Sequence, residues 1–194
     1  MTAPPWRIWV YGRSRTPWPF PPAPAGGRRE EDPVPLPDTA RALIDRHGLQ
    51  PHPEGGWFRE TWRAAHQVPT PFGRRPAGTV IAFLIGGEHV SRLHRLHQDE
   101  VWLHHAGPGL VLHLITPGGD HASHELSAEG SLQVVVPAGT WLGAEAPDGW
   151  ALVGCACMPG FDFADLELGE RDRLLARYPQ HAHLIDRLTP GCAR

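Results

Sequence analysis

The sequence predicts an all-β fold, a jelly-roll barrel with short helices at both ends. Between residues 57 and 158 the apolar residues fall in short continuous or alternating runs, such as TVIAFLI, GLVLHLIT, SLQVVVP and WALVGCACM. Turn-forming glycine, proline and aspartate separate these runs, and several short strands at such a spacing are typical of a sandwich or barrel. Apolar residues at helical spacing occur before and after this region.

The segments that flank the barrel carry helix signals. Asp38 is a favourable N-cap for a helix through ARALIDRH, and Gly48 is a favourable C-terminal stop. At the other end, LGERDRLLARYPQHAHLIDRLT has apolar residues at helical spacing that Pro179 interrupts, which predicts two short helices. We therefore expect one domain over residues 38–189 and a short tail at 190–194.

The chain has 194 residues, which is enough for one domain with a sizeable core. Residues 1–37 hold ten of the 22 prolines, a composition typical of a disordered or extended arm. Trp6, Trp9 and Trp18 lie within this arm, and aromatic side chains in a solvated tail are costly. An alternative is that they anchor the arm to the barrel or to a partner subunit.

Composition excludes several classes of function. The net charge is −3 and no arginine cluster alternates with aromatic residues, so we expect no nucleic-acid partner. All 18 basic residues are arginine, which excludes Schiff-base catalysis by a lysine of the protein. Cys155, Cys157 and Cys192 lack zinc-site spacing and are expected to be free thiols. Without a long apolar run or a signal peptide, we expect a cytoplasmic protein with no membrane partner.

Two motifs suggest a family. In GEHVSRLHRLHQDEVWLHHAG, residues 87–107, His94, Glu100 and Gly107 fit the first cupin motif, which has Gly, His-x-His, Glu and Gly. Pro137 and Gly139 in VVVPAGTWLG fit the second. With PHPEGGWFRET and PGFDFADLEL, these blocks resemble the functionally uncharacterised cupin family 5 over roughly residues 38–189. The resemblance implies a double-stranded β-helix barrel, commonly a homodimer, and little about chemistry.

The same motifs lack part of the usual cupin metal-ligand set. Leu96 stands where the second ligand would lie, and Leu142 stands in the final His position. A catalytic transition metal usually needs three protein side chains. We therefore favour no cofactor; a divalent metal would require His94, Glu100 and His104 as a substitute ligand.

The stretch from Glu88 to His105 predicts a hairpin that turns at Gln98. Side chains alternate along a strand, so one face of this hairpin would point into the barrel. The predicted lining is Arg92, His94, Leu96, Glu100, Trp102 and His104. An apolar wall with a few polar groups is the usual make-up of a small-molecule pocket.

Two further segments supply candidate ligand-binding residues. Gly55 and Gly56 permit a tight bend that could deliver Arg59 or Glu60 to the pocket mouth, where arginine would suit an anionic substrate. An Arg–Glu pair that joins a strand edge or a dimer interface is the alternative. Thr140 and Trp141 follow the second cupin motif and could contact a ligand, although Trp141 is equally suited to the core.

These residues lead to three functional hypotheses. We favour an enzyme that binds a small polar, anionic or sugar-like molecule in the barrel and acts as a non-redox isomerase, epimerase or lyase. In it, His94 and Glu100 share acid and base work. A metal-dependent oxygenase or decarboxylase is the second hypothesis, and a non-catalytic binding protein is the third. The alternative to catalysis or binding is that His94 and Glu100 are remnants of a metal site, now hydrogen-bonded together as a structural pair.

Overall fold

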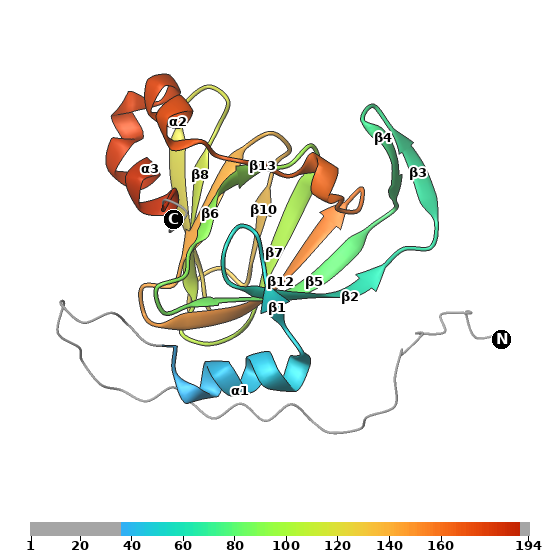
Figure 1. The fold of residues 1–194 in the computed structure, drawn as a ribbon, viewed down its shortest axis with the longest axis vertical. Coiled ribbons are helices and arrows are strands. Elements are labelled where there is room, and N and C mark those ends of the chain that lie inside the picture. The colour runs from blue at the N-terminus through green and yellow to red at the C-terminus, as the bar shows by residue number, and fades with distance from the viewer. Residues whose placement is uncertain (1–35, 191–194) are drawn as a thin grey trace, which may run out of the picture.

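Two antiparallel sheets lie face to face and enclose the largest cluster of buried apolar side chains (Figure 1). This computed structural model describes residues 36–190; Cys192 and most of the predicted arm and tail lie outside the described residues. The first sheet has the strand order β1-β2-β5-β12-β7-β10, with bounds Gln50–Pro51, Trp57–Arg63, Thr79–Gly86, Trp150–Met158, Asp99–Ala106 and Gln133–Val136. The second has the order β13-β6-β11-β8-β9, with bounds Glu167–Leu168, Ser91–Arg95, Trp141–Glu145, Leu110–Ile115 and His121–Leu126. The predicted all-β jelly roll is confirmed.

The core between the sheets follows from the alternation of side chains along the strands. Inward-facing residues of both sheets interdigitate in one cluster, which includes Phe83, Trp102, Leu112, Leu142 and Val153. These residues are almost wholly removed from solvent, and such burial is the main favourable contribution to folding.

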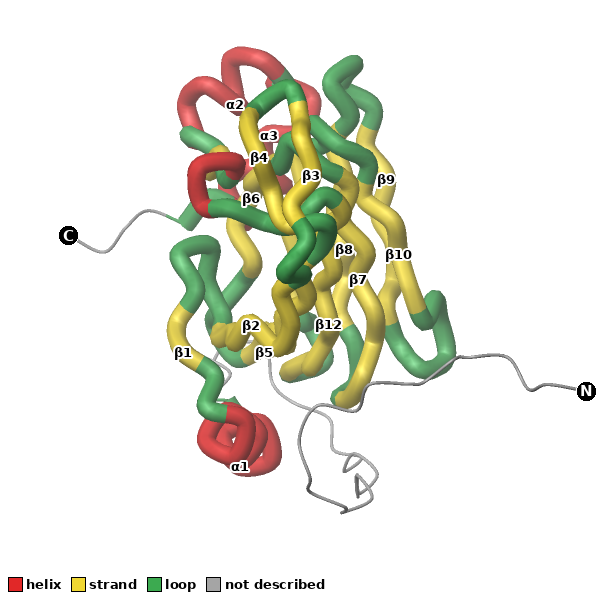
Figure 2. The backbone as a smooth tube through the Cα atoms, turned by 90° about the vertical axis from the view of Figure 1, so that its right-hand side faces the viewer, coloured by secondary structure: helices red, strands yellow, loops and turns green. Residues whose placement is uncertain are grey.

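Helices cover apolar surface outside the barrel, at opposite ends in both views (Figures 1 and 2). Helix α1 (Asp38–His47) packs Ala40 and Leu43 against the first sheet, and Gly48 ends it with φ of 59°, in the left-handed region. Asp38 is the first helical residue, and its side chain makes no capping hydrogen bond. The predicted pair of C-terminal helices is confirmed as α2 (Arg171–Arg177) and α3 (Ala182–Leu188), which pack on the second sheet.

A separate hairpin and two 3-10 turns complete the described fold. Strands β3 (Gln67–Thr70) and β4 (Gly73–Pro76) form the hairpin, which projects from the barrel (Figure 1). The 3-10 turns η1 (Phe163–Asp165) and η2 (Pro179–His181) precede β13 and α3. Within residues 36–190, no helix has the length and hydrophobicity needed to cross a membrane.

The predicted hairpin between Glu88 and His105 is wrong. Strand β6 belongs to the second sheet, where it pairs with β11 and β13, whereas β7 belongs to the first sheet and pairs with β12 and β10. The chain therefore crosses from one sheet to the other at residues 96–98. His94 and Glu100 still reach the same interior space, but they do so from opposite walls of the barrel.

Candidate functional site

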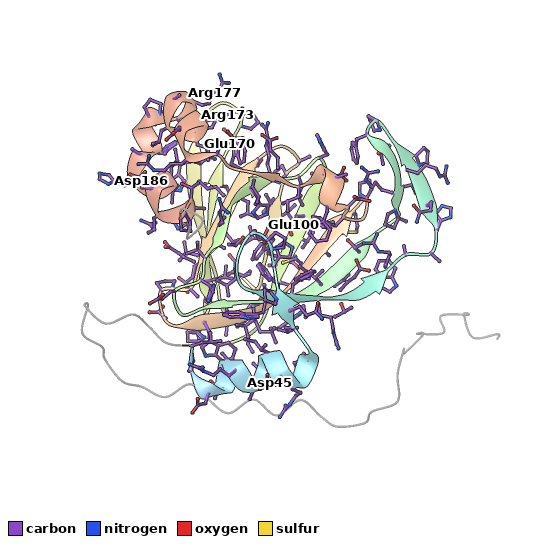
Figure 3. The ribbon with its side chains drawn as sticks, in the orientation of Figure 1. Asp45, Glu100, Glu170, Arg173, Arg177 and Asp186 are labelled. Atoms are coloured by element: carbon purple, nitrogen blue, oxygen red, sulfur yellow. The ribbon has the colours of Figure 1, made fainter. Side chains whose placement is uncertain are left out.

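His94 and Glu100 line a cavity in the barrel, and Figure 3 places Glu100 between the sheets. Both residues are buried, with exposed fractions of 2% and 7%. The cavity has a volume of about 60 Å³. Its lining also includes His52, Glu54, Phe58, Glu60, Arg63, Thr79, Ile81, Leu96, Cys155, Cys157, Phe161, Phe163 and Leu166.

A second carboxyl group, Glu54, meets His94 in this cavity. Its Oε2 lies 3.2 Å from Nε2 of His94, and the Ser91 hydroxyl donates a 3.1 Å hydrogen bond to its Oε1. The carboxyl is only 5% exposed, so these side chains replace water as its hydrogen-bond partners. Sequence patterns did not single out Glu54.

A tight turn between β1 and β2 carries Glu54 inward. The backbone N–H of Gly55 donates to the carbonyl of His52, and the N–H of Arg92 donates to the carbonyl of Glu54. Gly55 and Gly56 have φ of 110° and 69°, values that only glycine adopts readily. The predicted bend at this glycine pair is confirmed, and it delivers Glu54 to the base of the cavity.

An irregularity in β6 places both Ser91 and His94 beside Glu54. Regular alternation would put residues three positions apart on opposite faces of a strand. The register with β11 shifts between the pairs Leu142–His94 and Ala144–Ser91, as in a β-bulge. The shift turns the two polar side chains to the same interior space, while Leu93 packs outside against the cluster under α3.

The hydrogen bonds define the tautomer of His94. Its Nδ1 lies 2.8 Å from the carbonyl oxygen of Arg92, which can only accept, so Nδ1 carries the proton. In the neutral imidazole, Nε2 then has a lone pair that faces Oε2 of Glu54. A protonated Glu54 would donate to this nitrogen, which makes the two groups a neutral hydrogen-bonded pair.

Burial shifts the ionisation of all three groups in the direction of their neutral forms. It raises the pKa of Glu54 to about 8, against the opposing hydrogen bond from Ser91. It also raises the pKa of Glu100 to about 7, which nearby His94 opposes and Glu54 reinforces. Burial lowers the pKa of His94, although Glu100 and the Arg92 carbonyl favour its charged form. Near pH 7 the cluster therefore holds exchangeable protons.

Aromatic side chains and one ion pair surround the acid–base cluster. Burial lowers the pKa of His52 to about 4, with a smaller contribution from His94, and its Nδ1 accepts from the N–H of Glu54. The His52 ring packs edge-on against Phe58, with centroids 4.4 Å apart. Glu60 reaches the cavity and forms a 2.6 Å ion pair with Arg63, three residues further along β2, and this pair joins neither two strands nor two subunits.

Six predicted site residues do not line this cavity: Arg59, Arg92, Trp102, His104, Thr140 and Trp141. Arg59 lies on the same face of β2 as Trp57, and Trp57 packs with the residues under helix α1. Phe58 and Glu60, which line the cavity, are on the opposite face. Arg92 and His104 are absent from the cavity lining, and the register shift in β6 breaks the predicted alternation at Arg92. The His104 Nε2 instead donates to the Gly107 carbonyl at 3.1 Å, which removes His104 from any set with His94 and Glu100.

The remaining predicted residues lie close to the cavity or outside the barrel. Trp102 is in the core; its indole N–H has no regular hydrogen bond but lies near enough to Glu100 to favour the charged carboxylate. Thr140 lines a smaller cavity that His94 and Glu100 share. Trp141 packs on the outer side of β11 beneath the C-terminal helices, with the Arg95 guanidinium 4.7 Å from its ring centre.

The family follows from the sequence and from this barrel. Residues 41–169 match a protein family that is described as Cupin superfamily (DUF985). The chain belongs to this family of the cupin superfamily. No curated protein matches the chain.

Two solved structures of similar proteins have the same cupin fold. A hypothetical protein from Leishmania major is 37% identical, with coverage of 77% of this chain and 97% of that chain and a TM-score of 0.73. A protein from Shewanella oneidensis, solved by X-ray crystallography, is also 37% identical, with coverage of 77% and 96% and a TM-score of 0.71. Both relatives are therefore similar to the barrel domain over almost their whole length.

The donor set of this cupin does not fit a three-ligand metal centre. Leu96 and Leu142 occupy two positions that hold ligands in the family motifs, and His104 is directed elsewhere. Within the described part of the chain, no group of three or more His, Cys, Asp and Glu side chains is arranged to hold a metal ion. Glu54 is already bonded to Ser91 and His94, so we derive no step through a metal.

Glu54 and Ser91 escaped prediction for different reasons. Glu54 lies in PHPEGGWFRET, whose glycine pair signalled a bend, but a carboxylate in a turn has the same sequence pattern whether it points inward or to solvent. Ser91 reaches Glu54 only because of the register shift in β6, which strict alternation does not anticipate.

Proposed function

We propose that this cupin catalyses proton transfer on a small polar molecule, as an isomerase, an epimerase or a lyase that works without redox chemistry. The observation that supports it is the convergence of Glu54, His94 and Glu100 in one buried cavity. General acid–base catalysis needs groups with a pKa near the working pH, and burial brings both carboxyls into that range.

The two carboxyl groups suit different roles. With a pKa of about 7, Glu100 is divided between acid and carboxylate near neutrality, and its carboxylate can take a proton from a carbon next to a carbonyl group. Glu54, with a pKa of about 8, holds a proton that it shares with His94. This pair can supply a proton to the carbonyl oxygen as negative charge develops there, which gives an enediol when the substrate is a hydroxy-carbonyl compound. Transfer of the first proton from Glu100 to the neighbouring carbon, with return of a proton to the pair from the hydroxyl that becomes the new carbonyl, completes an isomerisation.

The cavity limits the part of a substrate that reaches these groups. Its volume of about 60 Å³ accommodates a few water molecules or the reacting end of a small molecule. Phenylalanine and isoleucine side chains form the apolar wall, and the Arg63 guanidinium at the lining is neutralised by Glu60. A small hydroxy acid or a sugar derivative is a suitable substrate, because it has a carbon beside a carbonyl group and its reacting end is small enough for the cavity.

Hydrogen–deuterium exchange at carbon tests the proposal whatever the product of the reaction is. The protein is incubated in D₂O with a panel of small hydroxy acids, keto acids and sugars, and proton NMR follows loss of the signal at the carbon beside the carbonyl. We expect exchange on one class of compound, abolished in Glu100→Gln and reduced at least tenfold in Glu54→Gln.

A surface variant and a binding measurement complete the experiment. Glu129→Gln removes an exposed carboxyl and is expected to leave exchange unchanged. Exchange that persists in Glu100→Gln would refute the proposed base. A compound that binds in native mass spectrometry but never exchanges would indicate a binding protein rather than an enzyme.

A further inference from the structure

Gln98 is a buried polar residue without a partner beside the acid–base cluster. It lies in the crossing between β6 and β7, and only 3% of it is exposed. Both its amide atoms, Nε2 and Oε1, are buried and make no hydrogen bond with the described residues. Burial of an amide without hydrogen bonds costs about 1–3 kcal/mol, so native proteins almost always provide a partner.

Hydrogen bonds on either side of Gln98 hold the crossing against the loop that precedes β11. The Leu96 carbonyl accepts a 2.8 Å hydrogen bond from Gly139 N–H, and the Asp99 carboxylate accepts one of 2.8 Å from Ala138 N–H. The neighbours His97 and Asp99 are exposed, whereas Gln98 is buried.

Gln98 is among the residues that line a cavity of the size of one water molecule. This second cavity has a volume of about 10 Å³, and a buried water needs about 10–15 Å³ and two to four polar partners. Gln98 supplies a donor and an acceptor. The other lining residues are His94, Arg95, Leu96, Glu100, Val136, Pro137, Thr140 and Leu142.

The small cavity adjoins the larger one through shared residues. His94, Leu96 and Glu100 line both, whereas the remaining walls come from different parts of the fold. Val136 and Thr140 flank the connection from β10 to β11, and they are absent from the lining of the larger cavity. His94 and Glu100 therefore border two spaces, and Gln98 lines only the smaller one.

We propose that this small cavity is a site for one ordered water molecule, which Gln98 holds against Glu100 and His94. Gln98 is then a positioning residue that acts through the water. This inference rests on the proposed function for its role: the water offers Glu100 a proton path that stays open while the substrate fills the larger cavity. The existence of the water site itself does not depend on catalysis.

Oxygen-17 magnetic relaxation dispersion tests the site, because it counts internal waters with long residence times. We expect Gln98→Leu, which removes both polar atoms at similar length, to lose one such water relative to the wild-type protein. Gln133→Leu, at an exposed position in β10, is the matched control and is expected to lose none. A crystal structure of the wild-type protein should place the water within hydrogen-bond distance of the Gln98 amide.

Stability separates a water site from a merely unsatisfied amide. If Gln98 has no partner, Gln98→Leu should raise the melting temperature, since an apolar group replaces a desolvated polar one. If a water satisfies it, we expect no rise and an unchanged fold. A raised melting temperature with an unchanged water count would overturn the inference, whereas failure of the exchange assay alone would refute only the proposed function.

Discussion

At the scale of single residues, the pair between Glu54 and His94 is the feature on which the proposed chemistry depends. The Arg92 carbonyl fixes the proton on Nδ1 of His94, and this leaves Nε2 as an acceptor for Glu54. Two neutral groups in a hydrogen bond avoid the large cost of buried charge. The proton between them is thus available for transfer near neutral pH.

Replacement of Glu54 distinguishes a neutral from a charged carboxyl. Glutamine can still donate to His94 and accept from Ser91, so we expect Glu54→Gln to change the free energy of unfolding at pH 7 by less than about 1 kcal/mol. Glu54→Ala leaves both partners unsatisfied and should cost about 2–4 kcal/mol. Urea denaturation measures both. Equal losses in the two variants would indicate that a carboxylate, not an acid, is the resident form.

At the scale of elements, the turn before β2 determines where Glu54 points. A Cβ at Gly55 would fall on the Val90 carbonyl oxygen, and φ of 110° is closed to alanine. We expect Gly55→Ala to cost about 2–4 kcal/mol and to displace the carboxyl from His94. Gly48→Ala is the control, because its φ is also positive but nothing lies within 4 Å of a Cβ there.

Denaturation of both glycine variants, with NMR spectra of His94, checks this prediction. Gly48→Ala should lose about 1 kcal/mol, the usual cost of alanine at a left-handed C-cap, and leave the His94 signals unchanged. Similar losses in the two variants, or unchanged His94 signals in Gly55→Ala, would show that the turn does not position the site.

Sequence patterns predicted the elements better than their pairing. The apolar runs and the glycine at residue 48 gave correct strands and a correct helix end, because these depend on local periodicity and backbone freedom. The hairpin turning at Gln98 was wrong because a short connection is compatible both with a hairpin and with a crossing between two sheets. Tertiary packing decides between them, and no local pattern records it.

The same limit applies to the site. His94 and Glu100 were predicted from motif positions, and the structure brings them to one cavity even though the assumed pairing was wrong. Arg92 and His104 were predicted from that pairing and do not join them. Glu54 comes from a turn about 40 residues earlier in the chain, and long-range contacts of this kind are set by the whole fold.

At the scale of the whole molecule, the buried groups predict how stability depends on pH. Glu54 and Glu100 have raised pKa values, so they bind more protons in the folded state. Their contribution is fully present below the unfolded value of 4.5 and is lost as pH rises through 7 and 8. His52 and His94 have lowered pKa values, so their contribution is present above 6.5 and is lost as pH falls; for His52 the loss extends to about 4.

Urea denaturation from pH 4 to pH 9 checks this dependence. We expect the free energy of unfolding to fall on the alkaline side, by at most about 8 kcal/mol for two carboxyl pKa values raised from 4.5 to about 8 and about 7. In the double variant Glu54→Gln, Glu100→Gln, the free energy of unfolding should change little on the alkaline side. It should still fall on the acid side, as in the wild-type protein. If the free energy of unfolding falls equally at alkaline pH in the double variant, other groups cause the pH dependence.

The most direct test of the acid–base cluster is an NMR titration of the protein with carbon-13-labelled glutamate carboxyls and nitrogen-15-labelled histidines. We predict that two carboxyls titrate at about 8 and about 7, that Glu54→Gln and Glu100→Gln remove them one at a time, and that His94 remains neutral with its proton on Nδ1 at pH 7. Titration of both carboxyls near the ordinary value of 4.5, or a charged His94 at pH 7, would contradict the account.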